Sequence, residues 1–229
     1  MRIGAVQKTS LIEYPGKISA IIFIQGCNFR CPYCHNPELV IPSTFAAPVP
    51  EEEITAFLKS RIGYLEAIVI TGGEPCLNND LIEFMDKIKN FGFCLKLETN
   101  GSFPEKISEI IERGVVDYIG MDIKGPPGKY ERIVKADIDS GRILESVEII
   151  KNSGLSYEFQ TTVVRSMLEK EDFERIGELV RGAGRFFLQK FRPTKTLDPD
   201  FLNEESYSEG ELEEFRGILK RYVTECEIR

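Results

Sequence analysis

The stretch Ala20-Ile21-Ile22-Phe23-Ile24 is short, apolar and rich in β-branched residues, and Gly26 follows it. These properties predict a strand that is buried on both faces. Comparable stretches recur at 67–71, 93–99, 118–124, 157–164 and 186–191. Apolar residues at helical spacing lie between and after them, at 51–62, 81–88, 107–111, 143–150, 173–180 and 212–223. Strand and helix therefore alternate about six times, which predicts an α/β fold with parallel strands.

The number of units limits the architecture. A complete eight-unit barrel usually needs about 250 residues, whereas this chain has 229. A doubly wound sheet is the alternative, but no Gly-x-Gly-x-x-Gly follows the first predicted strand. We expect a partial (β/α)6 barrel of parallel strands, in a single domain over residues 1–229, with its core at about 18–193 and a C-terminal loop and helix at about 194–229. Either parallel arrangement places the functional site at the C-terminal ends of the strands.

Two long loops are predicted, at 39–50 and 193–210. Loops of this length are usually either functional or disordered. The sequence leaves both readings open.

Composition excludes several classes of protein. The chain has 29 Lys and Arg against 37 Asp and Glu, a net charge of −8, which argues against nucleic acid as the main partner. No apolar run approaches the ~18–20 residues of a membrane span, and residues 1–10 lack the apolar region of a secretory signal. We therefore expect a cytoplasmic protein with no membrane partner. In that reducing compartment its six cysteines predict metal ligands, reactive thiols or core residues rather than disulfides.

Three cysteines, Cys27, Cys31 and Cys34, fall within eight residues directly after the first predicted strand. Thiolates at this spacing can converge on one centre and select zinc or an iron–sulfur cluster. A structural zinc needs a fourth ligand, and His35 is poorly placed because it adjoins Cys34. Three thiolates on a four-iron cluster leave one iron open, and an open position indicates catalysis. The remaining cysteines are expected to be structural: Cys76, Cys94 and Cys226.

The cysteine segment resembles the cluster-binding motif of the radical S-adenosylmethionine (SAM) superfamily, in which an aromatic residue, here Tyr33, precedes the third cysteine. Gly72-Gly73-Glu74, after the second predicted strand, resembles the family segment that holds the amino group of SAM. Glycines permit close backbone approach, and a carboxylate suits an ammonium group. A Gly-Gly turn with a solvated Glu74 is the alternative. The resemblance implies one [4Fe-4S] cluster, with Cys27, Cys31 and Cys34 as ligands, and SAM bound at the open iron.

Other predicted strand ends resemble cofactor-binding segments of glycyl-radical activating enzymes. The resemblance assigns Lys124 to the SAM carboxylate and Asp122 to a ribose hydroxyl or a monovalent cation, with a solvated salt bridge between the two as the alternative. It places Tyr33 against the adenine. Further cofactor-binding positions implied in the same way are Thr99, Asn100, Arg165 and Gln189.

Around these motifs, residues 7–17, 23–27 and 34–38 resemble the activating proteins of anaerobic ribonucleoside-triphosphate reductase, and the similarity extends over essentially the whole chain. Activators of pyruvate formate-lyase share the run at 34–37. They usually carry Asp-Gly-Pro-Gly where this chain has Glu13-Tyr14-Pro15-Gly16, and Asp where it has Glu98. The departures favour the reductase activator.

The resemblance also implies a reaction. The cluster, reduced by a flavodoxin- or ferredoxin-type donor, cleaves SAM to methionine and a 5′-deoxyadenosyl radical, which abstracts hydrogen from a backbone glycine of the partner reductase. Three alternatives remain open: an activator of another glycyl-radical enzyme, a small-molecule radical SAM enzyme such as 7-carboxy-7-deazaguanine synthase, and a zinc- or cluster-stabilised interaction protein.

Overall fold

The computed structural model describes all residues from Met1 to Arg229 and divides into two compact units. The first unit contains residues 1–28, 37–99 and 105–119. The second contains residues 29–36, 100–104 and 120–229. Parallel strands alternate with helices in both units, which confirms the predicted α/β class and is consistent with the partial barrel.

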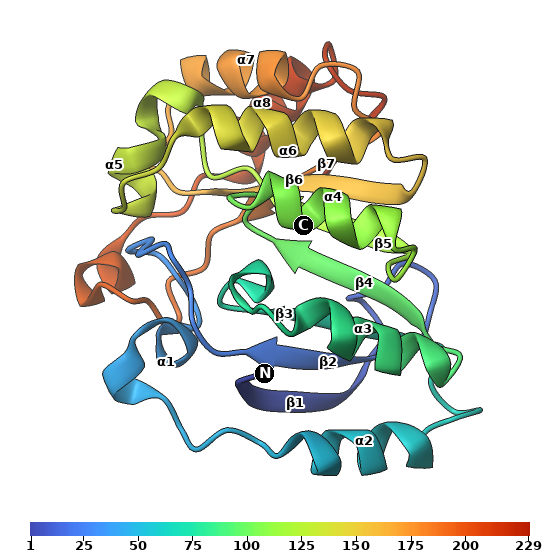
Figure 1. Ribbon diagram of the computed structural model, residues 1–229. Coiled ribbons are helices and arrows are strands. Elements are labelled where there is room, and N and C mark those ends of the chain that lie inside the picture. Colours follow the sequence, from blue (N-terminus) through green and yellow to red (C-terminus); the bar gives the residue numbers. More distant parts are fainter. The chain divides into compact units, whose positions relative to one another are not determined.

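In the first unit, β1 (Ile3–Ser10), β2 (Ser19–Ile24), β3 (Ala67–Gly72) and β4 (Cys94–Thr99) are neighbours in that order. β1 is antiparallel to β2, and the other pairs are parallel. The helices of this unit are α1 (Pro37–Val40), α2 (Glu51–Ser60), α3 (Leu81–Asn90) and, from its second residue, α4 (Pro104–Glu112). Figure 1 shows α3 running beside β4. Five of the six residues of β2 and the first four of β3 are buried, as expected of parallel strands that are covered on both faces.

In the second unit, β6 (Ser156–Val163), β7 (Arg185–Lys190) and β8 (Glu225–Ile228) form parallel pairs in that order. Its helices are α5 (Tyr130–Val134), α6 (Ser140–Asn152), α7 (Lys170–Leu179) and α8 (Glu209–Leu219). α8 contacts α7, β7 and β8 (Figure 1), and the rings of Phe173 and Phe215 stack at 4.2 Å between α7 and α8. β5 (Tyr118–Asp122) crosses the division between the units.

All six predicted strands are present with bounds within two residues of the prediction. β1 and β8 were not predicted. Both lack a continuous apolar run: β1 contains Gln7-Lys8-Thr9, and β8 alternates glutamates with Cys226 and Ile228. A strand with one neighbour can carry polar residues, so the criterion of a buried apolar run misses it.

The two predicted long loops contain short ordered elements. The 3-10 helix η1 (Pro42–Thr44) lies in the first loop, and η4 (Pro199–Asn203) lies in the second. Asp198 caps η4, since its carboxylate accepts the N–H of Asp200 at 3.1 Å. The second loop therefore contains ordered structure.

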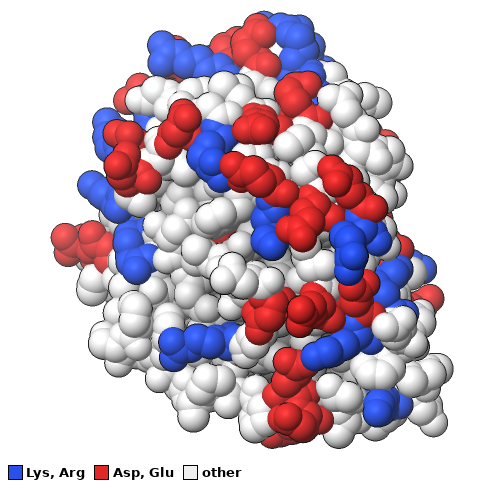
Figure 2. Space-filling view, in the orientation of Figure 1, with Lys and Arg blue, Asp and Glu red and all other residues white.

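Acidic and basic side chains are interspersed on the face shown in Figure 2. Some charged side chains of the protein form ion pairs three residues apart, such as Lys151 with Glu148 on α6 and Arg181, just past the end of α7, with Glu178. Exposed pairs of this kind contribute little to stability. No helix has the combined length and apolar character needed to cross a membrane.

Candidate functional site

The turn after β3 lies against the end of β2 within the first unit. The N–H of Gly73 donates to the carbonyl of Ile24 at 2.8 Å, and the N–H of Glu74 donates to the carbonyl of Gly26 at 2.7 Å. A Cβ atom on Gly73 would lie 1.9 Å from the Gly26 carbonyl oxygen, so this approach requires glycine. The Gly-Gly-Glu segment is thereby joined to the residues that lead into Cys27.

Glu74 is fully buried, and its carboxylate is held by donors from the same unit. Its Oε1 accepts the N–H of Cys76 at 3.0 Å and the hydroxyl of Thr99, the last residue of β4, at 2.7 Å. The alternative of a solvated Glu74 is therefore wrong. Burying a carboxylate is costly unless donors compensate it. The structure thus brings two predicted site residues, Glu74 and Thr99, into one hydrogen-bonded group.

We expect Thr99→Val to lower the free energy of unfolding by about 2 kcal/mol, because it removes a hydrogen bond to a buried carboxylate. Thr99→Ser keeps the hydroxyl and should cost about 1 kcal/mol or less, through its lost methyl group. Anaerobic urea denaturation of both variants measures the difference. Equal destabilisation would mean that the hydroxyl does not support Glu74.

The second half of the cysteine segment belongs to the second unit, and α5 holds one side of it. The N–H of Arg30 donates to the carbonyl of Val134 at 2.7 Å. The ring of Phe29 meets the ring of Tyr130 edge-on, with centroids 6.3 Å apart. Both aromatic side chains are buried, so α5 fixes the start of this half-segment by packing as well as by a hydrogen bond.

The end of β7 and the residues after it hold the other side. His35 stacks on Phe191, with centroids 5.5 Å apart and planes inclined by 2°, and its Nε2 lies 3.0 Å from the Arg192 carbonyl oxygen. Farther along the chain, the N–H of Asp198 donates to the carbonyl of Pro32 at 2.9 Å. Sequence reasoning missed these contacts because they join residues more than 150 positions apart. The single histidine is thus engaged in holding the loop.

Cys31 and Cys34 lie on one turn, in which the N–H of Cys34 donates to the carbonyl of Cys31 at 3.0 Å. Cys27 belongs to the first unit. Within either unit taken alone, no three His, Cys, Asp or Glu side chains gather into a metal site. The three-cysteine ligand set therefore remains a prediction that rests on spacing and donor chemistry.

Asp122 and Lys124 form an ion pair at 3.0 Å at the end of β5, with side chains 28% and 16% exposed. The predicted alternative of a salt bridge is present, although it is largely buried rather than solvated. Burial opposes the charge on Lys124, but Asp122, followed by Tyr33 and Cys31, outweighs burial and holds the pKa of Lys124 well above its ordinary value. Lys124 is therefore a cation at neutral pH.

Tyr33 is buried, and its hydroxyl has no hydrogen-bond partner. Burial, reinforced by Cys31, raises the pKa of Tyr33 well above its ordinary value, so the phenol is neutral. A buried hydroxyl without a partner is costly, and a polar ligand beside Lys124 and Asp122 would offset that cost. A buried donor near a fixed ion pair and two cysteines fits a cofactor that is both polar and cluster-bound.

The remaining predicted positions have partners of other kinds. Asn100 closes a turn, since its Oδ1 accepts the N–H of Ser102 at 3.0 Å and its hydroxyl at 2.6 Å. Nη2 of Arg165 donates to both carboxylate oxygens of Glu211, at 2.8 and 2.7 Å, and the guanidinium carbon of Arg165 lies 4.2 Å from the Tyr207 ring centroid. Gln189 is exposed on β7. The cofactor roles of these three residues stay predictions.

The other cysteines lie in packed surroundings. Burial and the neighbouring Glu74 raise the pKa of Cys76 well above its ordinary value, and burial raises the pKa of Cys226 to about 12. Cys94 packs against the core cluster of Tyr14 and Tyr118. Metal ligation requires a thiolate, so the protonated thiols of Cys76 and Cys226 agree with the predicted structural role.

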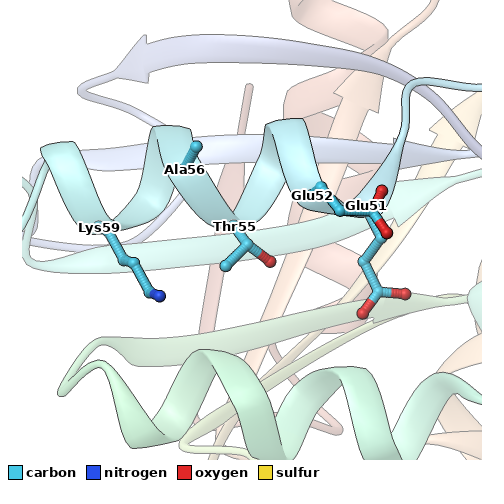
Figure 3. Close-up of a pocket in the computed structure, with 5 residues that line it drawn as sticks. All are labelled: Glu51, Glu52, Thr55, Ala56 and Lys59. Atoms are coloured by element: carbon cyan, nitrogen blue, oxygen red, sulfur yellow. The ribbon is translucent and has the colours of Figure 1, made fainter.

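A hollow lies along α2 and is lined by residues of that helix alone: Glu51, Glu52, Thr55, Ala56 and Lys59. Figure 3 shows Glu51, Thr55 and Lys59 projecting from the same side of the helix. None of the predicted site residues lines it. The chemistry therefore points to the strand ends rather than to this hollow.

Comparison with known proteins identifies a matching family. The model of the radical SAM superfamily matches residues 21–181. This span begins in β2 and includes the cysteine segment and the Gly-Gly-Glu turn.

Three proteins illustrate the similarity. A protein of Methanocaldococcus jannaschii, provisionally named a glycyl-radical enzyme activating enzyme, is 35% identical over 99% of this chain and 95% of its own. The 7-carboxy-7-deazaguanine synthase of Thermococcus kodakarensis is 27% identical over 78% of this chain and 76% of its own. The crystal structure of a domain of pyruvate-formate lyase-activating enzyme from Bacteroides vulgatus matches 71% of this chain and 98% of its own, with a TM-score of 0.57 and 14% identity. The last likeness concerns the fold.

Proposed function

Because the chain belongs to the radical SAM superfamily, we propose that it activates a glycyl-radical enzyme, namely an anaerobic ribonucleoside-triphosphate reductase. The observation that carries the proposal is the 35% identity, along nearly the full length of both chains, to a protein provisionally named a glycyl-radical enzyme activating enzyme. The run from Thr9 to Glu38 favours the reductase as its substrate. A cytoplasmic location and a flavodoxin- or ferredoxin-type electron donor complete the proposal.

Membership of the family implies a [4Fe-4S] cluster and SAM. In the proposal the cluster ligands are Cys27, Cys31 and Cys34. Bound together, cluster and SAM supply one-electron chemistry that ends in abstraction of a hydrogen atom from the substrate. The protein contributes orientation and the exclusion of competing reactions.

The proposed SAM contacts are those that the family resemblance implies, and the burial of Glu74 in the first unit and the ion pair of Lys124 in the second support them. Gly72, Gly73 and Glu74 receive the amino group, since Glu74 is a buried carboxylate fixed by Thr99. In the second unit Lys124 pairs with the SAM carboxylate, and Asp122 holds Lys124 in place and accepts from the ribose. Tyr33 lies against the adenosine, where its hydroxyl gains a partner. The remaining proposed positions lie at or near the C-terminal ends of β4, β6 and β7 and are Asn100, Arg165 and Gln189.

A second candidate is a small-molecule radical SAM enzyme of the 7-carboxy-7-deazaguanine synthase type. The 27% identity to such an enzyme over about three quarters of both chains favours it. It would need no protein substrate. The two functions therefore differ in what receives the radical.

The test uses the reconstituted, reduced protein with SAM and the anaerobic reductase of the same organism. We expect 5′-deoxyadenosine to form and a glycyl radical to appear on the reductase by electron paramagnetic resonance. A reductase in which the receiving glycine is replaced by alanine is the control and should give no signal. Formation of 5′-deoxyadenosine only with a small-molecule substrate would instead support the second candidate.

A further inference from the structure

A pocket outside the proposed cofactor site lies on the second unit. Its walls come from the end of α5, from the turn after β6 and from η4 in the loop at 193–210. The sequence left the role of that loop open. Because residues of η4 line this pocket, ligand binding is a candidate role for the loop.

One wall of the pocket is cationic. Arg132 and Lys135 line it with exposed side chains and form no ion pair, although the chain carries a net charge of −8. Lys135 also has a φ of 49°, and it is the one non-glycine residue with a positive φ. This left-handed conformation ends α5, because Lys135 is the C-cap residue of that helix and its N–H donates to the carbonyl of Glu131. The two cations are thus not ion-paired, although the acidic residues Asp200 and Glu204 line the same pocket.

The other residues that line the pocket include apolar and acidic ones. Met167 is buried and Phe201 is partly exposed, so they form an apolar floor. Glu204 fastens η4 to the turn after β6, since its Oε1 accepts the N–H of Ser166 at 2.9 Å. Asp200 stands on the same wall. A ligand carboxylate is therefore attracted to the basic residues at the end of α5 and repelled by the acidic residues of η4 and the residue that follows it. This difference in charge would orient the ligand in the pocket.

Both walls also hold the cysteine segment. Val134, next to Lys135, accepts the N–H of Arg30. Asp198, two residues before Asp200, donates to the carbonyl of Pro32. An occupant of the pocket would therefore touch the two elements that fix the predicted cluster loop.

We propose that this pocket docks a segment of the protein substrate in which an acidic residue lies close to an apolar one. The acidic side chain pairs with Arg132 and Lys135, and the apolar side chain rests on Met167 and Phe201, whose flexible and aromatic surfaces suit it. The proposal rests on the proposed function, which identifies the partner as a protein. Because the chain has a net negative charge, it repels an acidic partner at long range. Local cations are therefore needed to bind an acidic segment, and Arg132 and Lys135 supply them in this pocket.

The test measures the dissociation constant of the cluster-loaded protein for the anaerobic reductase by biolayer interferometry. Arg132→Glu and Lys135→Glu should each weaken binding by about tenfold, because they place repulsion where attraction stood. Arg175→Glu makes the same charge change on the exposed face of α7, outside the pocket, and should change binding by less than about twofold. Phe201→Ala should also weaken binding by about tenfold, because it removes part of the apolar floor. In 0.5 M salt the difference between the wild type and the two charge-reversal variants should become smaller, because charges are then screened within about 5 Å. The effect of Phe201→Ala should not change with salt.

Formation of 5′-deoxyadenosine without the reductase should be the same for all variants, which checks that fold and cofactors are intact. Wild-type-like binding by both charge-reversal variants would overturn the docking proposal even if the reductase becomes activated. Weaker binding by those variants, with no glycyl radical formed by the wild type, would uphold the docking site and refute the activase function. Absence of any binding by the wild type would overturn both.

Discussion

Cys31→Ala protein is expected to hold no SAM-responsive iron–sulfur cluster and to form 5′-deoxyadenosine at least about 10³-fold more slowly than the wild type, the scale of loss when an essential group is removed. Soft thiolates bind such clusters, and Cys31 is one of three cysteines in the eight-residue stretch 27–34 that follows β2. Anaerobic reconstitution, followed by absorbance and electron paramagnetic resonance with and without SAM, measures the loss. Cys27→Ala and Cys34→Ala should behave alike.

Cys226→Ala is the matched control because it removes a thiol from a packed position. Burial raises the pKa of Cys226 to about 12, so the thiol is protonated in this packed position. The variant should keep its cluster and its SAM cleavage. A Cys31→Ala protein that still held a SAM-responsive cluster would contradict the ligand assignment, and so would cluster loss in the control.

Gly73→Ala is expected to lower the free energy of unfolding by about 3 kcal/mol, at the upper end of what overpacking costs. The new Cβ would lie 1.9 Å from the carbonyl oxygen of Gly26 and 2.6 Å from its carbon. Those atoms are backbone and cannot move aside without displacing the segment that leads to Cys27. Anaerobic denaturation with urea gives the loss of stability, and iron content after reconstitution reports the effect on the cluster.

Gly128→Ala is the control for this prediction. No atom lies within 4 Å of a Cβ built on Gly128, and its φ is not positive. Its effect should stay within about 0.5 kcal/mol, as is usual at the surface. Equal stability of the Gly73→Ala and wild-type proteins would show that the two strand ends do not need this close contact.

The strands that carry the site could be predicted because their signal is local. Ala20–Ile24 and Ala67–Thr71 are apolar runs that end at glycines, and such runs form strands wherever both faces can be buried. β1 and β8 could not be predicted in this way, because each pairs with one neighbouring strand and tolerates polar residues. The contacts of the site residues could not be predicted for a different reason. Glu74 contacts Thr99, and His35 contacts Phe191, only after the chain folds.

The kind of chemistry could be predicted without the fold, because the spacing of Cys27, Cys31 and Cys34 and the run Gly72-Gly73-Glu74 can be read from the covalent chain. Thiolates and carboxylates favour particular ligands by donor type. Tertiary structure decided how those residues are supported. It buried Glu74 against Thr99, left the Tyr33 hydroxyl without a partner, and clamped the cysteine segment between α5 and the residues after β7. Such contacts depend on distances between segments far apart in the chain, which no local pattern records.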